Sequence, residues 1–298
     1  MSNHEHRIIE DADWGHRRLD PLPHDDELSA YYESKYYDLI QKGGRALELQ
    51  KLIAGGKEGN ATRAWLRHTL YDTILSALDS APGNRLLDVG CGIGEFISYA
   101  NECGLQTQGV EPAVQAVELA KSQGLRVEQG DLASFTAENH NSVFDAVVFL
   151  NVIEHSPQPM TLLQQAYDLL ADGGLLVCRL PNDFSSLQEL ARAQNNSRRW
   201  WVVIPDHINY FNFENFPPIL RRLGFEIVDT MGDYPMEFFL LMGRDYIANP
   251  DLGKACHLER VALEMSMPGP QLRAMYRGFA SAGIGRNALF IARKNGAA

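Results

Sequence analysis

A glycine-rich turn, Gly90-Cys91-Gly92-Ile93-Gly94, follows an apolar run and precedes a helix-forming run that begins at Glu95. Glycine lets the backbone approach a bound molecule closely, and unpaired N–H groups at a helix N-terminus attract polar or anionic groups of a ligand. The order strand, glycine turn, helix is typical of nucleotide-type ligand binding at a parallel sheet. The turn therefore predicts a ligand site, and a tight connection without a ligand is the plainer alternative.

The spacing of these glycines distinguishes two classes of ligand. The dinucleotide fingerprint is G-x-G-x-x-G, with glycine or alanine at its third position. Here Glu95 occupies that third position, and Gly94 comes one residue too early. The turn does not leave the pyrophosphate cradle in its usual form, so it disfavours a nicotinamide cofactor.

The stretch Asp88-x-Gly90-x-Gly92-x-Gly94 resembles the first motif of class I S-adenosylmethionine-dependent methyltransferases. Later motifs of that family have matches in the right order, namely Glu111, Gly130-Asp131-Leu132, Leu150-Asn151-Val152-Ile153-Glu154-His155, and the stretches 170–174 and 175–182. The resemblance covers residues 62–230 and the last strand. It is closest to ubiquinone-biosynthesis O-methyltransferases and related small-molecule enzymes.

The resemblance implies S-adenosyl-L-methionine as cofactor and S-adenosyl-L-homocysteine as product. It places Glu111 on the ribose hydroxyls, a task that suits an acceptor-only carboxylate. It also places Asp131 and Leu132 around the adenine, and Asn151 and Val152 at the methionine end of the cofactor. The implied cofactor-binding residues are Gly90, Cys91, Gly92, Gly94, Glu111, Pro112, Asp131, Leu132, Asn151 and Val152. The plainer alternatives are a strand-end acid at Glu111, a turn former or helix cap at Asp131 and a small space-filling residue at Cys91.

Two histidines are candidates for the base that an acceptor hydroxyl would need. Histidine is the usual base near neutral pH. His155 lies just past the fourth strand of the predicted sheet, at the carboxyl edge where open α/β sheets bind ligands. His207, in the segment Pro205–Phe211, lies on a loop expected to cover that edge. His207 is the first choice and His155 the second, with a packing role as the alternative for each.

A cluster of large side chains near His207 is the candidate acceptor site. Arg199, Trp200, Trp201 and Tyr210 could form an aromatic lid whose arginine meets an anionic group, or they could pack an inserted helix.

We expect no metal. The histidines of the first 24 residues are irregularly spaced, and the acidic cluster of magnesium-dependent catechol O-methyltransferases is missing from the sequence.

Composition excludes several classes of protein. A formal net charge of −11 argues against nucleic acid as the main partner, because phosphate binding needs clustered basic residues. The four scattered cysteines favour a reducing cytoplasm, and the polar start lacks the apolar core of a signal peptide. Apolar runs are strand-sized, so no membrane association is expected.

Apolar periodicity predicts the elements that must position these residues. Strands are expected at 85–89, 107–111, 126–129, 144–150, 175–180, 225–229 and 288–292. Helices are expected at 31–52, 61–78, 95–103, 113–123, 161–171 and 214–223, with glycines at 55–56 and 173–174 ending two of them. Strand–helix alternation predicts a doubly wound parallel sheet.

The sequence therefore predicts an α/β, Rossmann-like class I methyltransferase fold with a seven-stranded, mostly parallel sheet. The family's strand order is 3-2-1-4-5-7-6, with the last strand antiparallel. Residues 1–60 are expected to form a helical lead-in or cap, and 61–298 the S-adenosylmethionine-binding domain with insertions at 183–213 and 233–286. The second insertion could cover the site or pair two subunits as a homodimer.

The expected function is S-adenosylmethionine-dependent methylation of a small molecule, with a hydroxyl oxygen favoured because histidine bases are at hand. An N-methyltransferase acting on an amino sugar or another amine is one alternative. A non-catalytic S-adenosylmethionine-binding protein is the other.

Overall fold

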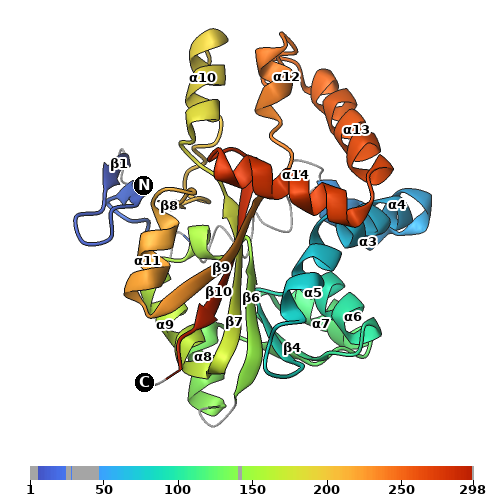
Figure 1. Ribbon diagram of the computed structural model, residues 1–298, viewed down its shortest axis with the longest axis vertical. Coiled ribbons are helices and arrows are strands. Elements are labelled where there is room, and N and C mark those ends of the chain that lie inside the picture. Colours follow the sequence, from blue (N-terminus) through green and yellow to red (C-terminus); the bar gives the residue numbers. More distant parts are fainter. Residues whose placement is uncertain (1–5, 25–27, 29–46, 140–142, 297–298) are drawn as a thin grey trace.

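A seven-stranded sheet with the order β5-β4-β3-β6-β7-β10-β9 forms the centre of the molecule (Figure 1). The structure is a computed structural model and describes residues 6–24, 28, 47–139 and 143–296. Paired strands from β5 to β7 are parallel, and β10 is antiparallel to both β7 and β9. The predicted strand order and the antiparallel last strand are confirmed.

The strands of this sheet are β3 (Arg85–Val89), β4 (Gln106–Glu111), β5 (Val127–Gln129), β6 (Phe144–Leu150), β7 (Leu170–Pro181), β9 (Phe225–Gly232) and β10 (Asn287–Lys294). Successive side chains of a strand point to opposite faces, so a strand covered on both sides needs a continuous apolar run. Val147 and Val148 of β6 accordingly belong to two different hydrophobic clusters.

Helices cover both faces of the sheet. One face packs against α8 (Leu132–Glu138), α9 (Pro159–Leu169) and α11 (Phe216–Arg222). The other packs against α5 (Asp72–Leu78), α6 (Glu95–Glu102), α7 (Val114–Ser122) and α14 (Gly269–Ser281). Beyond the end of β7 lie α10 (Ser186–Gln194), α12 (Glu237–Leu241) and α13 (Pro250–Ser266), at the top of Figure 1.

Most predicted helix boundaries are within two residues of those observed, and two differences have a structural reason. Helix starts at Gly56, not Ala61, and runs through α4 (Gly56–Leu66), the π-helical turn η2 (Arg67–Tyr71) and α5. The break between α3 (Leu47–Ala54) and this helix is at Gly55, which has a φ of 68°. The glycines at 173–174 do not end α9, which stops at Leu169; they lie in the first part of β7, where the pairing with β6 shifts register.

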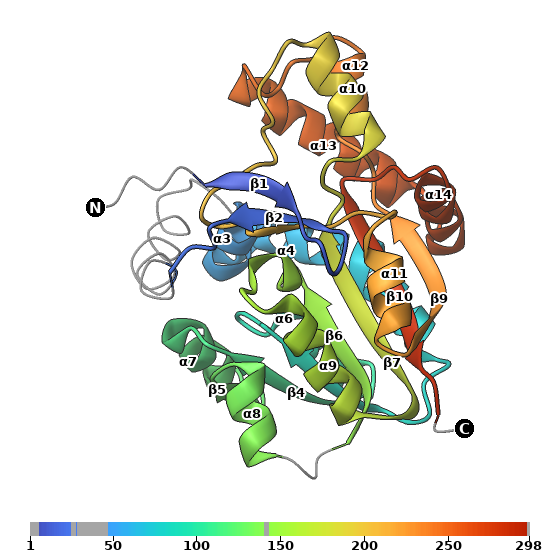
Figure 2. The same cartoon turned by 90° about the vertical axis from the view of Figure 1, so that its left-hand side faces the viewer.

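A small second sheet joins the start of the chain to the loop that carries His207. Strands β1 (Arg7–Glu10) and β2 (Arg17–Asp20) form a hairpin, and β2 pairs with β8 (Asn209–Tyr210). Figure 2 shows the hairpin between α10 and the central sheet. The sequence predicts helix in this lead-in, so these strands are a correction to that prediction. The predicted helix at 31–52 is described only from α3 (Leu47–Ala54); the rest lies outside the described residues.

Candidate functional site

The glycine turn after β3 has the backbone that its sequence requires. Gly90, Gly92 and Gly94 have φ values of 71°, 54° and 83°, in the left-handed region that favours glycine. A Cβ at Gly90 would lie 2.6 Å from a methyl group of Val152, whereas a Cβ at Gly92 would meet open space. The turn is therefore tightly packed at Gly90 and open at Gly92, which leaves backbone for a ligand to approach.

Glu111 is tied to that turn by its side chain. Its Oε2 accepts from the N–H of Gly92 at 3.0 Å, and its Oε1 accepts from the N–H of Ala113 at 3.0 Å, across Pro112. Burial raises the pKa of Glu111, and these two hydrogen bonds oppose the shift. Each oxygen keeps a lone pair, so the fixed carboxylate can still accept from a diol such as the cofactor ribose.

Cys91 and Asp88 complete the inner side of the turn. Burial raises the pKa of the Cys91 thiol, and a Cβ on Gly109 would lie 2.5 Å from its sulfur. Cys91 therefore fills the space above Gly109 as a neutral thiol. Burial and the charge of Glu111 also raise the pKa of Asp88, whose Oδ1 has no hydrogen-bond partner among the described residues. An orphaned acceptor beside an open glycine turn fits a cofactor that brings N–H or O–H donors.

Asp131 caps helix α8. Its Oδ1 accepts from the N–H of Ser134 at 2.8 Å, and Ser134 Oγ returns the contact to the backbone N–H of Asp131 at 3.1 Å. The hydrogen bond from Ser134 lowers the pKa of Asp131, and burial opposes it. Leu132 is buried beside it. The capping alternative for Asp131 is therefore what the structure shows, and a contact with adenine stays a prediction.

Asn151 and Val152 follow β6 and face the glycine turn through Val152. Asn151 has a φ of 60°, rare for a residue other than glycine. Its amide donates to Glu154 Oε1 at 3.1 Å, and its Oδ1 accepts from Arg179 of β7. The two side-chain bonds hold this strained backbone at the point where the resemblance places the methionine end of the cofactor.

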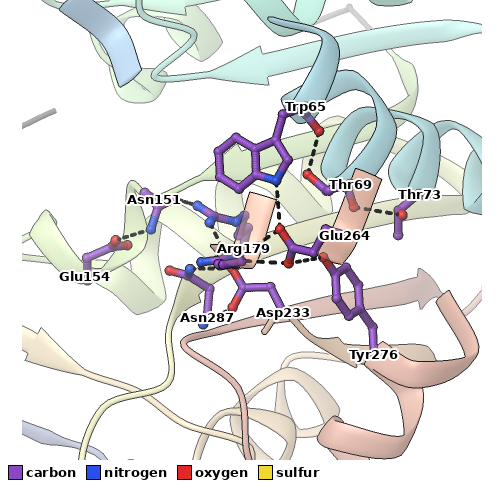
Figure 3. Close-up of polar contacts among 11 residues, drawn as sticks. Trp65, Thr69, Thr73, Asn151, Glu154, Arg179, Asp233, Glu264, Tyr276 and Asn287 are labelled. Carbon is purple, nitrogen blue, oxygen red and sulfur yellow. Dashed lines mark hydrogen bonds and ion pairs between the residues drawn. The ribbon is translucent and has the colours of Figure 1, made fainter. Parts of the chain in front are cut away.

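A buried polar chain continues from Arg179 away from the site (Figure 3). Arg179 and Arg260 both reach Asp233 Oδ2, at 3.4 Å and 3.1 Å. Arg260 also contacts Glu264 at 3.1 Å, and Glu264 accepts from Trp65 Nε1 at 2.7 Å and Tyr276 OH at 2.6 Å. This network of buried polar side chains thus links the Asn151 loop to α13, α14 and α4.

This network of buried polar side chains is not predicted from the sequence. One signal was available: Arg179 is the only charged residue in the strand segment 175–181, whose other members are apolar or proline. Charged side chains are rarely buried unless they are paired, so Arg179 implied a buried acidic partner. The identity of that partner, Asp233, could not be read from the sequence because the two residues are 54 positions apart.

The two candidate bases lie together, as their predicted places at one sheet edge implied. The rings of His155 and His207 meet edge to face with centroids 5.1 Å apart. His155 Nδ1 lies 2.7 Å from the carbonyl oxygen of Asp206 and 3.3 Å from its carboxylate. Burial opposes the charge of His155, but the contacts with Asp206 and the charge of Glu154 outweigh it and raise the pKa of His155 to about 9. His155 is therefore a cation near neutral pH, which makes it a poor base.

His207 has a different environment. Its Nδ1 lies 3.7 Å from Oδ2 of Asp183, the second residue beyond the end of β7. Both atoms are buried, and neither has a hydrogen-bond partner among the described residues. Burial raises the pKa of Asp183, and the contact with His207 opposes the shift. A small movement that brings His207 Nδ1 closer to Asp183 Oδ2 would form a hydrogen bond that orients the imidazole ring of His207.

A metal ion has one candidate location in the part of the chain that the structure describes. Glu154, His155 and His207 each offer a ligand atom, and these atoms all lie within 4.8 Å of one another. His155 would have to lose its proton to bind a metal there. The absence of a metal stays a prediction.

Some residues of the predicted aromatic lid are buried in the core, and others lie at the surface. Trp201 and Tyr210 are 5% and 1% exposed, and Phe184 packs edge to face against both. Trp200 packs edge to face on Trp201. Arg199 pairs with Glu189 at 2.8 Å, so its charge is already matched. This arrangement favours the packing alternative for Trp201 and Tyr210, and leaves Trp200 and Arg199 as the outward members.

Comparison with known proteins agrees with this geometry. Residues 62–230 match the model of a family described as a methyltransferase domain. A ubiquinone biosynthesis O-methyltransferase from Cereibacter sphaeroides is 31% identical over 168 residues, which cover 54% of this chain and 68% of that protein. The chain therefore belongs to the methyltransferase domain family. It is an S-adenosylmethionine-dependent methyltransferase.

Two solved structures share the fold. The plantazolicin methyltransferase BpumL, solved with S-adenosylhomocysteine, superposes with a TM-score of 0.52 at 15% identity, covering 90% of this chain and 94% of that one. The [4+2]-cyclase SpnF superposes with a TM-score of 0.54 at 19% identity, covering 93% and 99%. Together with the sheet order, they establish the class I methyltransferase fold. Among the described helices, none has the length and apolar character needed to cross a membrane.

Proposed function

We propose that this chain transfers a methyl group to a hydroxyl oxygen of a small molecule, with His207 as the general base. The observation that carries the proposal is the buried pair of His207 Nδ1 and Asp183 Oδ2, 3.7 Å apart, beside the loop that follows β6. A carboxylate at Nδ1 leaves the other ring nitrogen, Nε2, to take a proton. His155, the neighbouring ring, is already protonated near neutral pH.

The residues of this chain have two proposed tasks, which are to hold the cofactor and to take a proton from the acceptor. S-adenosylmethionine, when bound, supplies a methyl group already activated on a sulfonium, so alignment is the main task of the protein. The open backbone at Gly92 and the carboxylate of Glu111 would hold the cofactor. His207 Nε2 accepts the proton of the acceptor hydroxyl, and Asp183 stabilises the imidazolium that results. A positioned base contributes roughly 10²–10⁴-fold to the rate.

A labelled-methyl assay with His207→Gln tests the proposal. Acceptors come from a screen of hydroxyl- and amine-bearing small molecules against the wild-type protein. We expect kcat to fall by ~10²-fold or more, because the base is lost. S-adenosylmethionine affinity, measured by calorimetry, should stay unchanged. His24→Gln, an exposed histidine, is the matched control.

Two outcomes would contradict the proposal. A wild-type rate in His207→Gln would rule out His207 as the general base. It is the result expected of an N-methyltransferase, whose pH profile follows the substrate amine. Cofactor binding without transfer to any acceptor would favour a binding protein. The same assay with EDTA tests the expectation that no metal takes part.

A further inference from the structure

The hairpin of β1 and β2 lies against the loop that carries His207. Strand β2 pairs with β8, and the N–H of Leu19 donates to the carbonyl oxygen of Ile208 at 2.9 Å. Leu19, Ile208 and Tyr210 also belong to one buried hydrophobic cluster. These contacts begin at the residue directly after His207, so the start of the chain fixes the backbone on one side of the proposed base.

His16, which is buried, makes the most specific contact between the hairpin and this loop. Its Nε2 lies 3.1 Å from Asn209 Oδ1, and its ring stacks on Phe211 with centroids 5.0 Å apart. The side-chain nitrogen of Asn209 donates to the carbonyl oxygen of Ser156 at 2.7 Å. A carbonyl oxygen only accepts, so the amide oxygen of Asn209 faces His16, and His16 must supply the donor. A donor at residue 16 therefore orients Asn209.

The other side of the loop is bonded to the turn that follows β6. The N–H of Ile208 donates to the carbonyl oxygen of Glu154 at 3.1 Å. The hydroxyl of Tyr210 donates to the carbonyl oxygen of His207 itself at 2.9 Å. The loop is thus held between the hairpin and this turn, and the backbone of His207 is bonded to a residue of the strand that the hairpin pairs with.

The hairpin also contacts the segment that carries Asp183, the proposed partner of the base. The guanidinium of Arg17 lies 4.7 Å from the ring centroid of Phe184, the residue directly after Asp183. The N–H of Asp183 donates to the carbonyl oxygen of Phe211 at 2.8 Å, in the same loop as His207. Both members of the His207–Asp183 pair therefore lie on segments that the hairpin contacts.

We infer that the β1–β2 hairpin is a positioning element for the proposed base, and that His16 is the side chain through which it fixes the loop of His207. The inference rests on the proposed function. The hairpin precedes residues 62–230, which match the methyltransferase domain family, so the family match does not include it. The 3.7 Å between His207 Nδ1 and Asp183 Oδ2 is longer than a hydrogen bond, so the loop must supply much of the orientation of the ring. A misplacement of about 1 Å can cost roughly 100-fold in rate.

The first test is amide hydrogen exchange of the S-adenosylhomocysteine-loaded protein, followed by mass spectrometry, and it needs no acceptor. His16→Phe keeps a ring that can stack on Phe211 but removes the donor. We expect the amides of residues 206–211 to exchange roughly 2–10-fold faster, the effect of losing one neutral hydrogen bond, while those of β6 stay unchanged. His16→Gln keeps an N–H donor and should lie nearer the wild type. His24→Phe, at an exposed histidine, is the matched control.

Two results of this experiment would overturn the inference. Unchanged exchange of residues 206–211 in His16→Phe would show that the hydrogen bond of His16 does not hold the loop. An equal rise in β6 would show a general loss of stability in place of a local one.

The second test is the labelled-methyl assay with the same variants. We expect kcat to fall by about tenfold in His16→Phe, with S-adenosylmethionine affinity unchanged in calorimetry, because the loop of His207 is displaced and the glycine turn is not. A residue that acts through His207 has no effect once His207 is gone, so His16→Phe combined with His207→Gln should be no slower than His207→Gln alone. If the two losses multiply, His16 acts independently of the base and the inference is overturned.

The two proposals fail in different ways. If His207→Gln slows transfer and His16→Phe does not, the base stands and the positioning role is rejected. If neither variant slows transfer, the base itself is rejected, and the hairpin has no base to position. If no acceptor is found, hydrogen exchange decides: a selective loss of protection at residues 206–211 supports the inference, and unchanged protection rejects it.

Discussion

Replacing Glu264 by glutamine tests whether the buried polar chain stabilises the fold. Glu264 is fully buried and accepts from Trp65 Nε1 at 2.7 Å, Tyr276 OH at 2.6 Å and Arg260 Nε at 3.1 Å. Glutamine keeps the shape but removes the charge, and it turns an N–H₂ group toward one of these donors. Breaking a buried ion pair from one side costs roughly 3–5 kcal/mol. Since Arg260 keeps its contact with Asp233 at 3.1 Å, we expect the lower end, about 3 kcal/mol.

The assay is urea unfolding followed by fluorescence. With a slope of about 3 kcal/mol per molar, a loss of this size lowers the midpoint by about 1 M. Glu259→Gln is the matched control, because Glu259 is on the same helix and pairs with Arg244 at the exposed surface. Exposed pairs add little to stability, so the control should unfold like the wild type. An unchanged midpoint in Glu264→Gln would refute the idea that the buried polar network around Glu264 stabilises the fold.

Two further predictions concern the site itself. Glu111→Ala should weaken S-adenosylmethionine binding by roughly 10–100-fold in calorimetry, since it removes a charged acceptor and frees the N–H of Gly92; an unchanged affinity would contradict the ribose role. His155 should titrate near its raised pKa of about 9 in an NMR titration, against a usual value of 6.5. Its contribution to stability is complete below the usual value and is lost as pH rises through about 9, so the melting temperature of the wild type should fall over that window more steeply than that of His155→Gln.

The central sheet could be predicted because its strands carry their signal locally. The run Phe144–Leu150 is apolar at almost every position and is found as a strand with these same bounds. The glycine turn and Glu111 could be placed for the same reason, since each lies at the end of such a run. Sequence order then brings them to one edge of the sheet, which is where ligands bind in this architecture.

The small sheet could not be predicted, because its strands depend on a distant partner. Strands β1 and β2 are four residues long and contain few apolar residues, and β8 has two residues. What fixes them is tertiary packing: His16 stacks on Phe211 and bonds to Asn209 at 3.1 Å. None of these contacts leaves a pattern in the local sequence.

The roles of the two histidines also depended on tertiary contacts. Sequence order placed His155 and His207 at one edge, and their rings are in contact. It could not show that Asp206 and Glu154 surround His155 while Asp183 faces His207. Those neighbours raise the pKa of His155 to about 9 and place a buried carboxylate 3.7 Å from Nδ1 of His207.

The family match covers the proposed cofactor residues but ends before Asp233, which holds Arg179. The residues assigned to the cofactor lie between 88 and 152, within the stretch that matches the methyltransferase domain family. Asp233 lies three residues beyond that stretch. His207 and Asp183, which are proposed to act on the acceptor, lie within the matched stretch as well. Because Arg179 bonds both Asp233 and Asn151, a substitution at Asp233 should loosen the loop after β6 and weaken S-adenosylmethionine binding.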